Sequence, residues 1–238
     1  HAECLSFSGD GKYLATGGND GLIRIWPTNS SRKPTLQGLK TLPGHPTETV
    51  NCLAFASDSN LLASGSDGVI KLWNLDDGVC RRTFEHQHLR TSSLVFVGVG
   101  TSIECLAATT DGSLIRISWN SSQTEFTSDL VVDGRTQFHN SVFSPSGSFL
   151  ATIDSANKVC LYEIKIDDMS MTQSVTLPAY RILRRTNAGM AFSPDNKVFA
   201  VLSDIKDEND HTAVVLIDVK GLTLQRRLEW RFPVALAL

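Results

Sequence analysis

The sequence has little that is typical of membrane, nucleic-acid-binding or secreted proteins. No apolar run approaches the roughly 18 residues that a membrane-spanning helix needs. The 22 basic and 25 acidic residues leave a net charge of −3, so no positive excess draws the chain to nucleic acid or to an anionic membrane. Five cysteines, an odd number spread over 238 residues, do not form the pattern of a disulfide framework. We therefore expect an intracellular protein, cytoplasmic or nuclear, with no nucleic-acid partner and no membrane segment within this chain.

Motifs of catalysis and cofactor binding are missing too. The sequence contains no G-x-S-x-G nucleophile elbow, no glycine-rich phosphate loop and no zinc-ligand spacing. His86 and His88 have a spacing that suits a metal on a strand, but no Cys or Asp pair accompanies them. We expect no cofactor, no metal and no catalytic site. An enzyme whose groups converge on the axis of the fold stays open as a hypothesis, because separate repeats can contribute such groups.

What the sequence has instead is an internal repeat. An apolar alternation ends in Phe, a small-polar turn follows, and two further apolar runs flank an Asp-Gly-type turn. The anchoring residues are Phe7, Phe55, Phe96, Phe143 and Phe192, which are separated by 48, 41, 47 and 49 positions. A period of about 40–50 residues, made of short strands and tight turns, is typical of the four-stranded blade of a β-propeller.

The repeat predicts an all-β fold with five visible blades. Their approximate bounds are 1–44, 45–88, 89–135, 136–183 and 184–231, and residues 232–238 begin a further blade. Fourth strands are expected in the variable stretches at 36–42, 80–84, 125–132, 174–177 and 223–228. The chain starts just before a first strand and ends in a strand-like run at 234–238. This leaves open a five-bladed ring, with 234–238 as a spare or closing strand, or an arc cut from a larger propeller, which is the arrangement we expect.

Two copies resemble the WD repeat. Gly44-His45 is followed by Leu-Ala-Ser-Gly-Ser-Asp-Gly at 62–68 and by Ile-Lys-Leu-Trp at 70–73, and residues 14–26 are similar. The resemblance implies a propeller that commonly closes with about seven blades. It also implies a rigid docking platform without catalytic activity.

The same resemblance implies a buried structural tetrad of His, Ser or Thr, Asp and Trp. The second copy supplies His45, Ser64, Asp67 and Trp73, and the first supplies Thr16, Asp20 and Trp26, with His1 as the candidate fourth member. A buried Asp needs hydrogen-bond partners, which His and the hydroxyl can provide. The Asp residues before Gly would also suit a metal or catalytic site, but their recurrence once per copy favours a role in the blade. The third copy departs from the pattern, with Ser118 where Trp is expected.

The resemblance finally implies a partner-binding face at the Asp-Gly turns and the loops before the first strands. Carried over position by position, its residues are Asn19, Ser66, Thr110, Glu48, Thr49, Arg90, Thr91, Gln137 and Asn187. We expect a non-catalytic scaffold that binds other proteins or peptides within a multiprotein complex. The alternative is a propeller regulator of a small GTPase, of the nucleotide-exchange type, anchored to a membrane by a segment outside this chain. Its functional loop would be the acidic stretch at 204–211.

Overall fold

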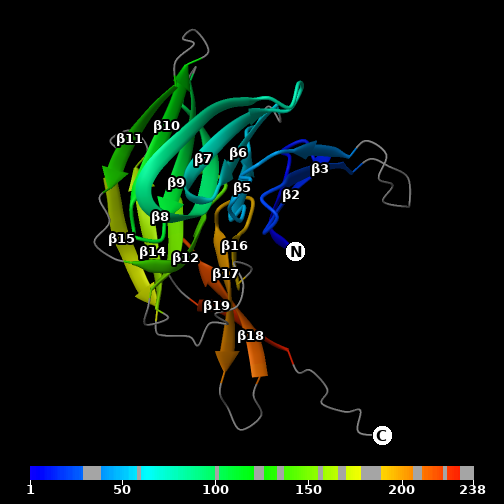
Figure 1. The fold of residues 1–238 in the computed structure, drawn as a ribbon. Helices are drawn as coiled ribbons and strands as arrows, with labels where there is room; N and C mark the ends of the chain where they lie inside the picture. The colour runs from blue at the N-terminus through cyan, green and yellow to red at the C-terminus, as the bar shows by residue number, and fades with distance from the viewer. Residues whose placement is uncertain are drawn as a thin grey trace, which may run out of the picture.

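The expected all-β architecture is confirmed. The computed structural model describes residues 1–28, 39–57, 60–99, 102–120, 126–132, 137–154, 158–165, 170–177, 189–205, 211–221 and 224–230. Throughout these residues the regular elements are strands, each paired antiparallel with its neighbours (Figure 1). Short runs rich in branched and aromatic residues, bounded by Gly, Asp and Asn turns, favour this structure.

The first copy forms one four-stranded sheet, in which each strand pairs with the next in the chain. Its strands are β1 (Ala2–Phe7), β2 (Tyr13–Gly18), β3 (Ile23–Pro27) and β4 (Lys40–Leu42). The last two copies form sheets of the same order. Their strands are β12 (Phe138–Phe143), β13 (Phe149–Asp154), β14 (Val159–Lys165) and β15 (Ser170–Leu177), and then β16 (Met190–Phe192), β17 (Val198–Ile205), β18 (His211–Asp218) and β19 (Leu224–Trp230).

The second and third copies share a single seven-stranded sheet. Its strands are β5 (Cys52–Phe55), β6 (Leu61–Gly65), β7 (Asp67–Asn74), β8 (Cys80–Val99), β9 (Ser102–Thr109), β10 (Leu114–Asn120) and β11 (Phe126–Val132). The fourth strand expected at 80–84 and the first strand of the next copy are therefore one element, β8. Its 20 residues contain no Pro, and no Gly before Gly98, so nothing in the chain interrupts the extended backbone.

One register rule is common to all five copies. An Ala on the second strand of each copy lies opposite an Ile or Leu on the third, in the pairs Ala15–Ile25, Ala63–Leu72, Ala107–Ile115, Ala151–Leu161 and Ala200–Leu216. The residue before each Ala points to the other face, because side chains alternate along a strand. In four copies that face carries a bulky apolar pair, namely Leu14–Trp26, Leu62–Trp73, Leu150–Tyr162 and Phe199–Ile217.

Neighbouring sheets bury these two kinds of face against one another. Ala15 and Ile25 of the first sheet pack in one core with Leu62 and Trp73. The same arrangement joins the last two sheets, where the core includes the Ala151–Leu161 and Phe199–Ile217 pairs. A small face thus receives a large one, which fills the space between the sheets and removes apolar surface from water.

The third copy reverses this order. Its Ala107–Ile115 pair packs with Ala63 and Leu72, so that two small faces meet, and Phe84 and Phe96 pack against this core. Its Leu106 points the other way and packs with Tyr162 of the next sheet. Leu106 pairs with Arg116 and Ser118 pairs with Glu104, in a register that runs without a break from Leu114–Ala108 to Asn120–Ser102.

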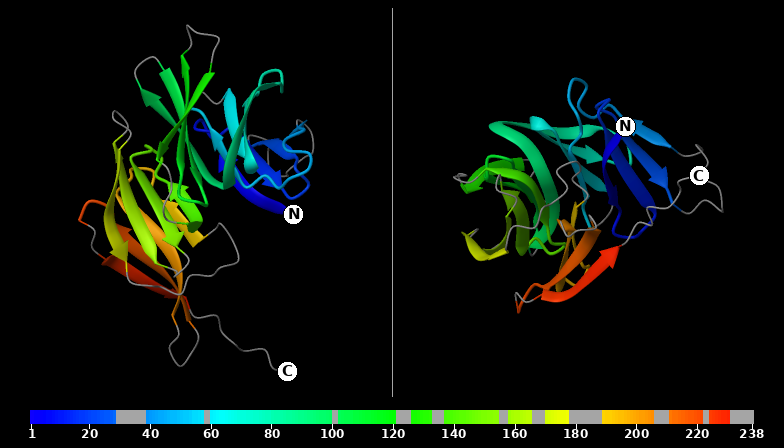
Figure 2. Two further views of the ribbon diagram at one scale, coloured as in Figure 1. Left: turned by 60° about the vertical axis from the view of Figure 1, so that its left-hand side comes forward. Right: turned by 90° about the horizontal axis from the view of Figure 1, so that it is seen from below.

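The sheets follow one another around an arc (Figure 2). Their inner strands β1, β5, β8, β12 and β16 are successive neighbours. Within the described residues the arc does not close into a ring. On the first sheet Leu5 and Phe7 remain 64% and 61% exposed, on the same face as Trp26. The arrangement fits a β-propeller with one blade face free at its start.

Candidate interaction site

The Gly44-His45 loop connects the first sheet to the second. The backbone N–H of His45 donates to the carbonyl oxygen of Gly21, at 2.7 Å, in the turn between β2 and β3. Gly21 and Gly44 both have positive φ, and a Cβ on either would overlap the backbone of the other loop. Lys71 on β7 donates to the carbonyl oxygen of Gly44, at 2.8 Å. Two glycines therefore allow the loops to approach closely, and the approach places His45 over the second sheet.

A buried hydrogen-bond chain joins three of the expected tetrad residues. The Ser64 hydroxyl lies 2.8 Å from Nε2 of His45 and accepts a 2.9 Å hydrogen bond from the indole N–H of Trp73. All three side chains are buried. The ammonium of Lys71 lies 5.8 Å from the Trp73 ring centroid, within the range of a cation–π contact. The network satisfies polar groups in the core and fixes where the loop before β5 leaves the sheet.

The environment of His45 keeps its imidazole neutral at neutral pH. Burial is the main cause, the nearby positive charge of Lys71 acts in the same direction, and a hydrogen bond to Ser64 opposes them. Together they lower the pKa of His45 to about 4. A neutral imidazole suits a structural bridge, because a charged one would be costly in this core.

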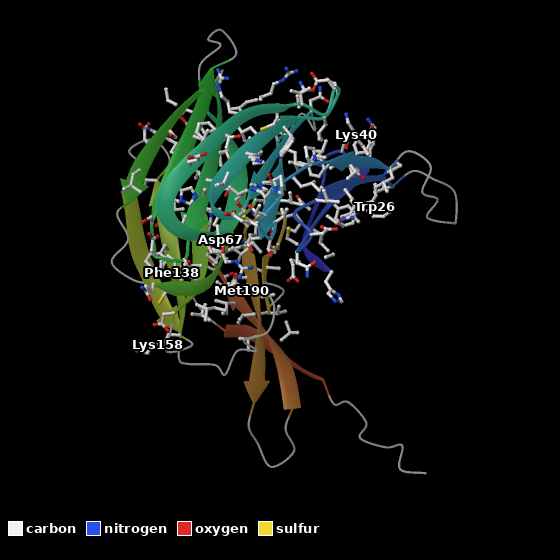
Figure 3. The ribbon with its side chains drawn as sticks, in the orientation of Figure 1. Trp26, Lys40, Asp67, Phe138, Lys158 and Met190 are labelled. Atoms are coloured by element: carbon white, nitrogen blue, oxygen red, sulfur yellow. The ribbon has the colours of Figure 1, made fainter. Side chains whose placement is uncertain are left out.

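The first copy repeats part of this arrangement. Trp26 donates its indole N–H to the Thr16 hydroxyl, at 3.0 Å, on a half-buried face (Figure 3). His1, the candidate fourth member, has a different contact: its terminal amine donates to Oδ1 of Asn19, at 3.0 Å.

The Asp residues of the turns lie outside the buried chains. Asp67 is exposed and its carboxylate accepts from the Asn51 amide, at 2.8 Å (Figure 3). Asp20 is also exposed and accepts from the Leu22 N–H and the Arg24 guanidinium, and the latter lowers its pKa most. In place of the expected buried pairing with His, Asp20 bonds within its own turn, and Asp67 bonds the buried side-chain amide of Asn51, 16 positions earlier in the chain.

The predicted partner-binding face divides into exposed, half-buried and buried residues. Its exposed members are Asn19 and Gln137, and its half-buried members are Glu48, Thr49, Arg90 and Thr110. Ser66 and Thr91 have no exposed surface, so their side chains make no direct contact with a partner in this arrangement. Asn187 lies outside the described residues.

Ser66 supports the predicted face through a hydrogen bond to Glu48 and does not contact a partner itself. Its hydroxyl donates to Oε2 of Glu48, at 2.8 Å, and so holds that carboxylate at the rim of the face. Backbone hydrogen bonds also run between neighbouring copies here, from Thr91 N–H to Ser66 O and from Thr110 N–H to Arg90 O. Sequence reasoning missed Asn51, which bonds Asp67; its one signal was its place immediately before β5.

Within the described residues, no three His, Cys, Asp or Glu side chains gather to hold a metal ion. The five cysteines form no disulfide within the described residues. Among the described residues there is no helix long and apolar enough to cross a membrane. Of the two His residues considered as a metal pair, His86 has its Nε2 atom 3.3 Å from the Thr91 hydroxyl. The side chain of His88 is not among those that the structure describes.

Repeated four-stranded sheets define a class of repeat protein. Here a Gly-His loop joins the first sheet to the second, and a buried Ser–Trp hydrogen bond lies within the second. The family model "WD domain, G-beta repeat" matches residues 1–27 and 36–74, which include the copies that contain Trp26 and Trp73. These two copies are therefore WD repeats.

Several curated proteins are similar over longer stretches. "WD repeat-containing protein WDS homolog" of Arabidopsis thaliana is 31% identical over 176 residues, which cover 68% of this chain and 30% of that protein. "Target of rapamycin complex subunit wat1" of Schizosaccharomyces pombe is 25% identical over 201 residues, 84% of this chain and 60% of that protein. "Cell division cycle 20.5, cofactor of APC complex" of Arabidopsis thaliana is 41% identical over 87 residues, 34% of this chain and 19% of that protein. The chain spans less than two thirds of each of these relatives.

Proposed function

We propose that this chain is a non-catalytic interaction platform that binds other proteins or peptides within a multiprotein complex. The observation that carries the proposal is the end face of the sheets, where polar turn residues are held by buried contacts. Asn19, Glu48 and Thr110 lie on turns and loops that His45, Ser66 and the backbone bonds between copies fix in place. A preorganised polar surface of this kind loses little conformational entropy when it binds. The names of two relatives, a cofactor of one complex and a subunit of another, support the same role.

We further propose that the arc belongs to a larger propeller of about seven blades, of which this chain contributes blades at approximately 1–44, 45–88, 89–135, 136–183 and 184–231 and the start of another at 232–238. The two outermost faces support this. The first sheet offers the large Leu14–Trp26 face, and the last offers the small Ala200–Leu216 face. These are the two kinds of face that pack together between the first and second sheets and between the last two sheets.

The five cysteines, which form no disulfide within the described residues, support an intracellular location, since thiols persist in reducing compartments. The GTPase-regulator alternative placed its function on the loop at 204–211, of which residues 206–210 lie outside the described chain. We therefore argue only the interaction platform.

Affinity purification of the full-length protein from its own cells, followed by mass spectrometry, tests the proposal. The variant N19A/E48Q/T110A removes polar groups from the face, and Gln at position 48 keeps an acceptor for Ser66. The matched control K12Q/K197Q changes two turn residues at the opposite end of the strands. We expect the triple variant to lose a defined set of partners that the control retains. Retention of every partner by a folded triple variant would show that this face is not the binding surface.

A further inference from the structure

The turn between the first and second strands has an anionic centre in two of the sheets. In the first sheet the Ser8 hydroxyl donates to Oδ1 of Asp10, at 2.7 Å, and the same oxygen accepts the Lys12 N–H, at 3.0 Å. In the last sheet the Ser193 hydroxyl donates to Oδ1 of Asp195, at 2.6 Å, which also accepts the Lys197 N–H, at 3.1 Å. The carboxylate therefore ties the turn together in both sheets.

These turns stabilise negative charge. The pKa of Asp10 lies well below its usual range, chiefly because the Ser8 hydroxyl donates to the carboxylate and next because the Lys12 N–H does. The pKa of Asp195 is lowered by the corresponding donors, the Ser193 hydroxyl and the Lys197 N–H. Hydrogen bonds to the charged form of a group favour that form. The hydroxyl and N–H donors of this turn therefore favour an anionic group at its third residue.

The turn of the sheet β12–β15 has the same geometry with a neutral residue at that position. Ser146 stands where the other turns have Asp, and its hydroxyl lies 3.2 Å from the Ser144 hydroxyl. It also accepts the Ser148 N–H, at 3.2 Å, while Ser144 accepts the Phe149 N–H, at 3.0 Å. The two contacts of the Ser146 hydroxyl are longer than those of the carboxylates, as expected for a neutral acceptor.

Ser146 differs from the other serines of the turn in its exposure and in its contact with a neighbouring turn. Ser146 is exposed, whereas Ser144 is completely buried. The N–H of Ser146 donates to Oδ1 of Asn196 in the turn of the last sheet, at 3.1 Å. The residue after Asn196 is Lys197, whose exposed ammonium is 3.4 Å from Asp195. A negative group on Ser146 would thus lie beside a turn that carries the exposed Lys197 ammonium.

We propose that Ser146 is a phosphorylation site whose phosphate takes the place that the carboxylates of Asp10 and Asp195 occupy in the sister turns. A protein kinase and ATP supply the group. The Ser146 oxygen forms a bond to the γ-phosphorus, the bond from that phosphorus to the bridging oxygen breaks, ADP leaves, and the hydroxyl proton passes to the kinase base. The phosphate then accepts the Ser148 N–H and the Ser144 hydroxyl, so that modification tightens this turn.

The first test measures stability in the full-length protein. Phosphoserine is installed at position 146 by genetic code expansion and compared with the unmodified protein, with S146D and with phosphoserine at position 148. Position 148 belongs to the same turn but is outside the acceptor position. We expect phosphoserine 146 and S146D to raise the melting temperature by about 2–4 °C, and phosphoserine 148 to give no rise. A fall in melting temperature on phosphorylation at 146 would overturn the proposal.

The second test asks whether the site is used. The full-length protein is isolated from its own cells with phosphatases inhibited, and the peptide spanning residues 144–149 is sequenced by mass spectrometry. We expect phosphate on Ser146 and none on the buried Ser144. A peptide map that covers this stretch and contains no phosphate, or carries it on Ser144 or Ser148 alone, would also overturn the proposal.

Discussion

The indole N–H of Trp73 donates a 2.9 Å hydrogen bond to the hydroxyl of Ser64, and both side chains are buried in the second sheet. The same hydroxyl lies 2.8 Å from Nε2 of His45, which comes from the loop that crosses from the first sheet. One oxygen atom therefore links two strands of a sheet to the connection between sheets. Its removal would affect the packing of two copies at once.

We expect S64A to lower the free energy of unfolding by about 2–4 kcal/mol, because it leaves two buried nitrogens, on His45 and Trp73, without their partner. The matched control is T16V, which removes the corresponding hydroxyl from a half-buried site, where it accepts the Trp26 N–H. Its cost should be smaller, about 1 kcal/mol. Urea denaturation followed by tryptophan fluorescence measures both. Equal losses would mean that the His45 link adds nothing.

Ala variants of Gly21 and Gly11 distinguish the cost of backbone strain from the cost of a steric overlap between sheets. The φ values of the two glycines are similar, +72° and +69°, but a Cβ on Gly21 would overlap the carbonyl of His45, whereas a Cβ on Gly11 would have open space around it. Ala at either position has the cost of the left-handed conformation, about 1 kcal/mol. We expect G21A to exceed G11A by a further 1–3 kcal/mol or so, as measured by denaturation midpoints. Matching midpoints for the two variants would contradict the close approach of the loops.

The low pKa of His45 makes stability depend on pH. Burial, aided by Lys71, lowers this pKa from 6.5 to about 4, so between these values the unfolded chain binds a proton that the folded protein does not. Stability is then complete above pH 6.5 and is lost as the pH falls toward 4. The expected loss is about 3 kcal/mol. Because carboxylates also titrate near pH 4, the measurement is the difference between the wild type and H45Q. Parallel pH profiles of the two proteins would refute the assignment.

The cysteines should differ in reactivity. Burial raises the pKa of the Cys105 thiol to about 12 from 9.0, which lowers its thiolate fraction about 1000-fold at neutral pH, and burial also raises the pKa of the Cys52 thiol well above 9.0. Cys80 is only half-buried. Labelling with iodoacetamide, followed by peptide mass spectrometry, should modify Cys80 well before Cys52 and Cys105. In denaturant all three should react at similar rates; rapid native labelling of Cys105 would show that this core opens readily.

Local patterns in the chain predict a large part of this structure. The alternation of apolar residues, the Asp-Gly turns and the repeated Phe anchors predict antiparallel strands, because side-chain period and turn chemistry act over a few residues. The Ser64–Trp73 and Thr16–Trp26 pairs follow from the same spacing together with the WD-repeat resemblance. Most expected strand positions agree with the structure because each depends on only its own segment.

Other features depended on which groups come together in space. The sequence marks Asp67 as a tetrad residue, but its carboxylate reaches Asn51, since the donor that is closest in the fold decides the partner. Ser66 looks like a surface contact in the sequence, yet the loop carrying Glu48 covers it. Strand register decides how two copies merge through β8 and which face of the third copy meets its neighbour. A one-residue change of register would exchange the two faces of a strand.

The sequence by itself therefore determined the all-β class, the repeat and the residues that build each hairpin, because these follow from local periodicity and turn preference. The tertiary structure decided which face of each sheet is buried, which polar groups pair and which residues of the predicted partner face reach the surface. Those outcomes depend on packing between strands far apart in the chain, where small and bulky faces must fill a shared volume.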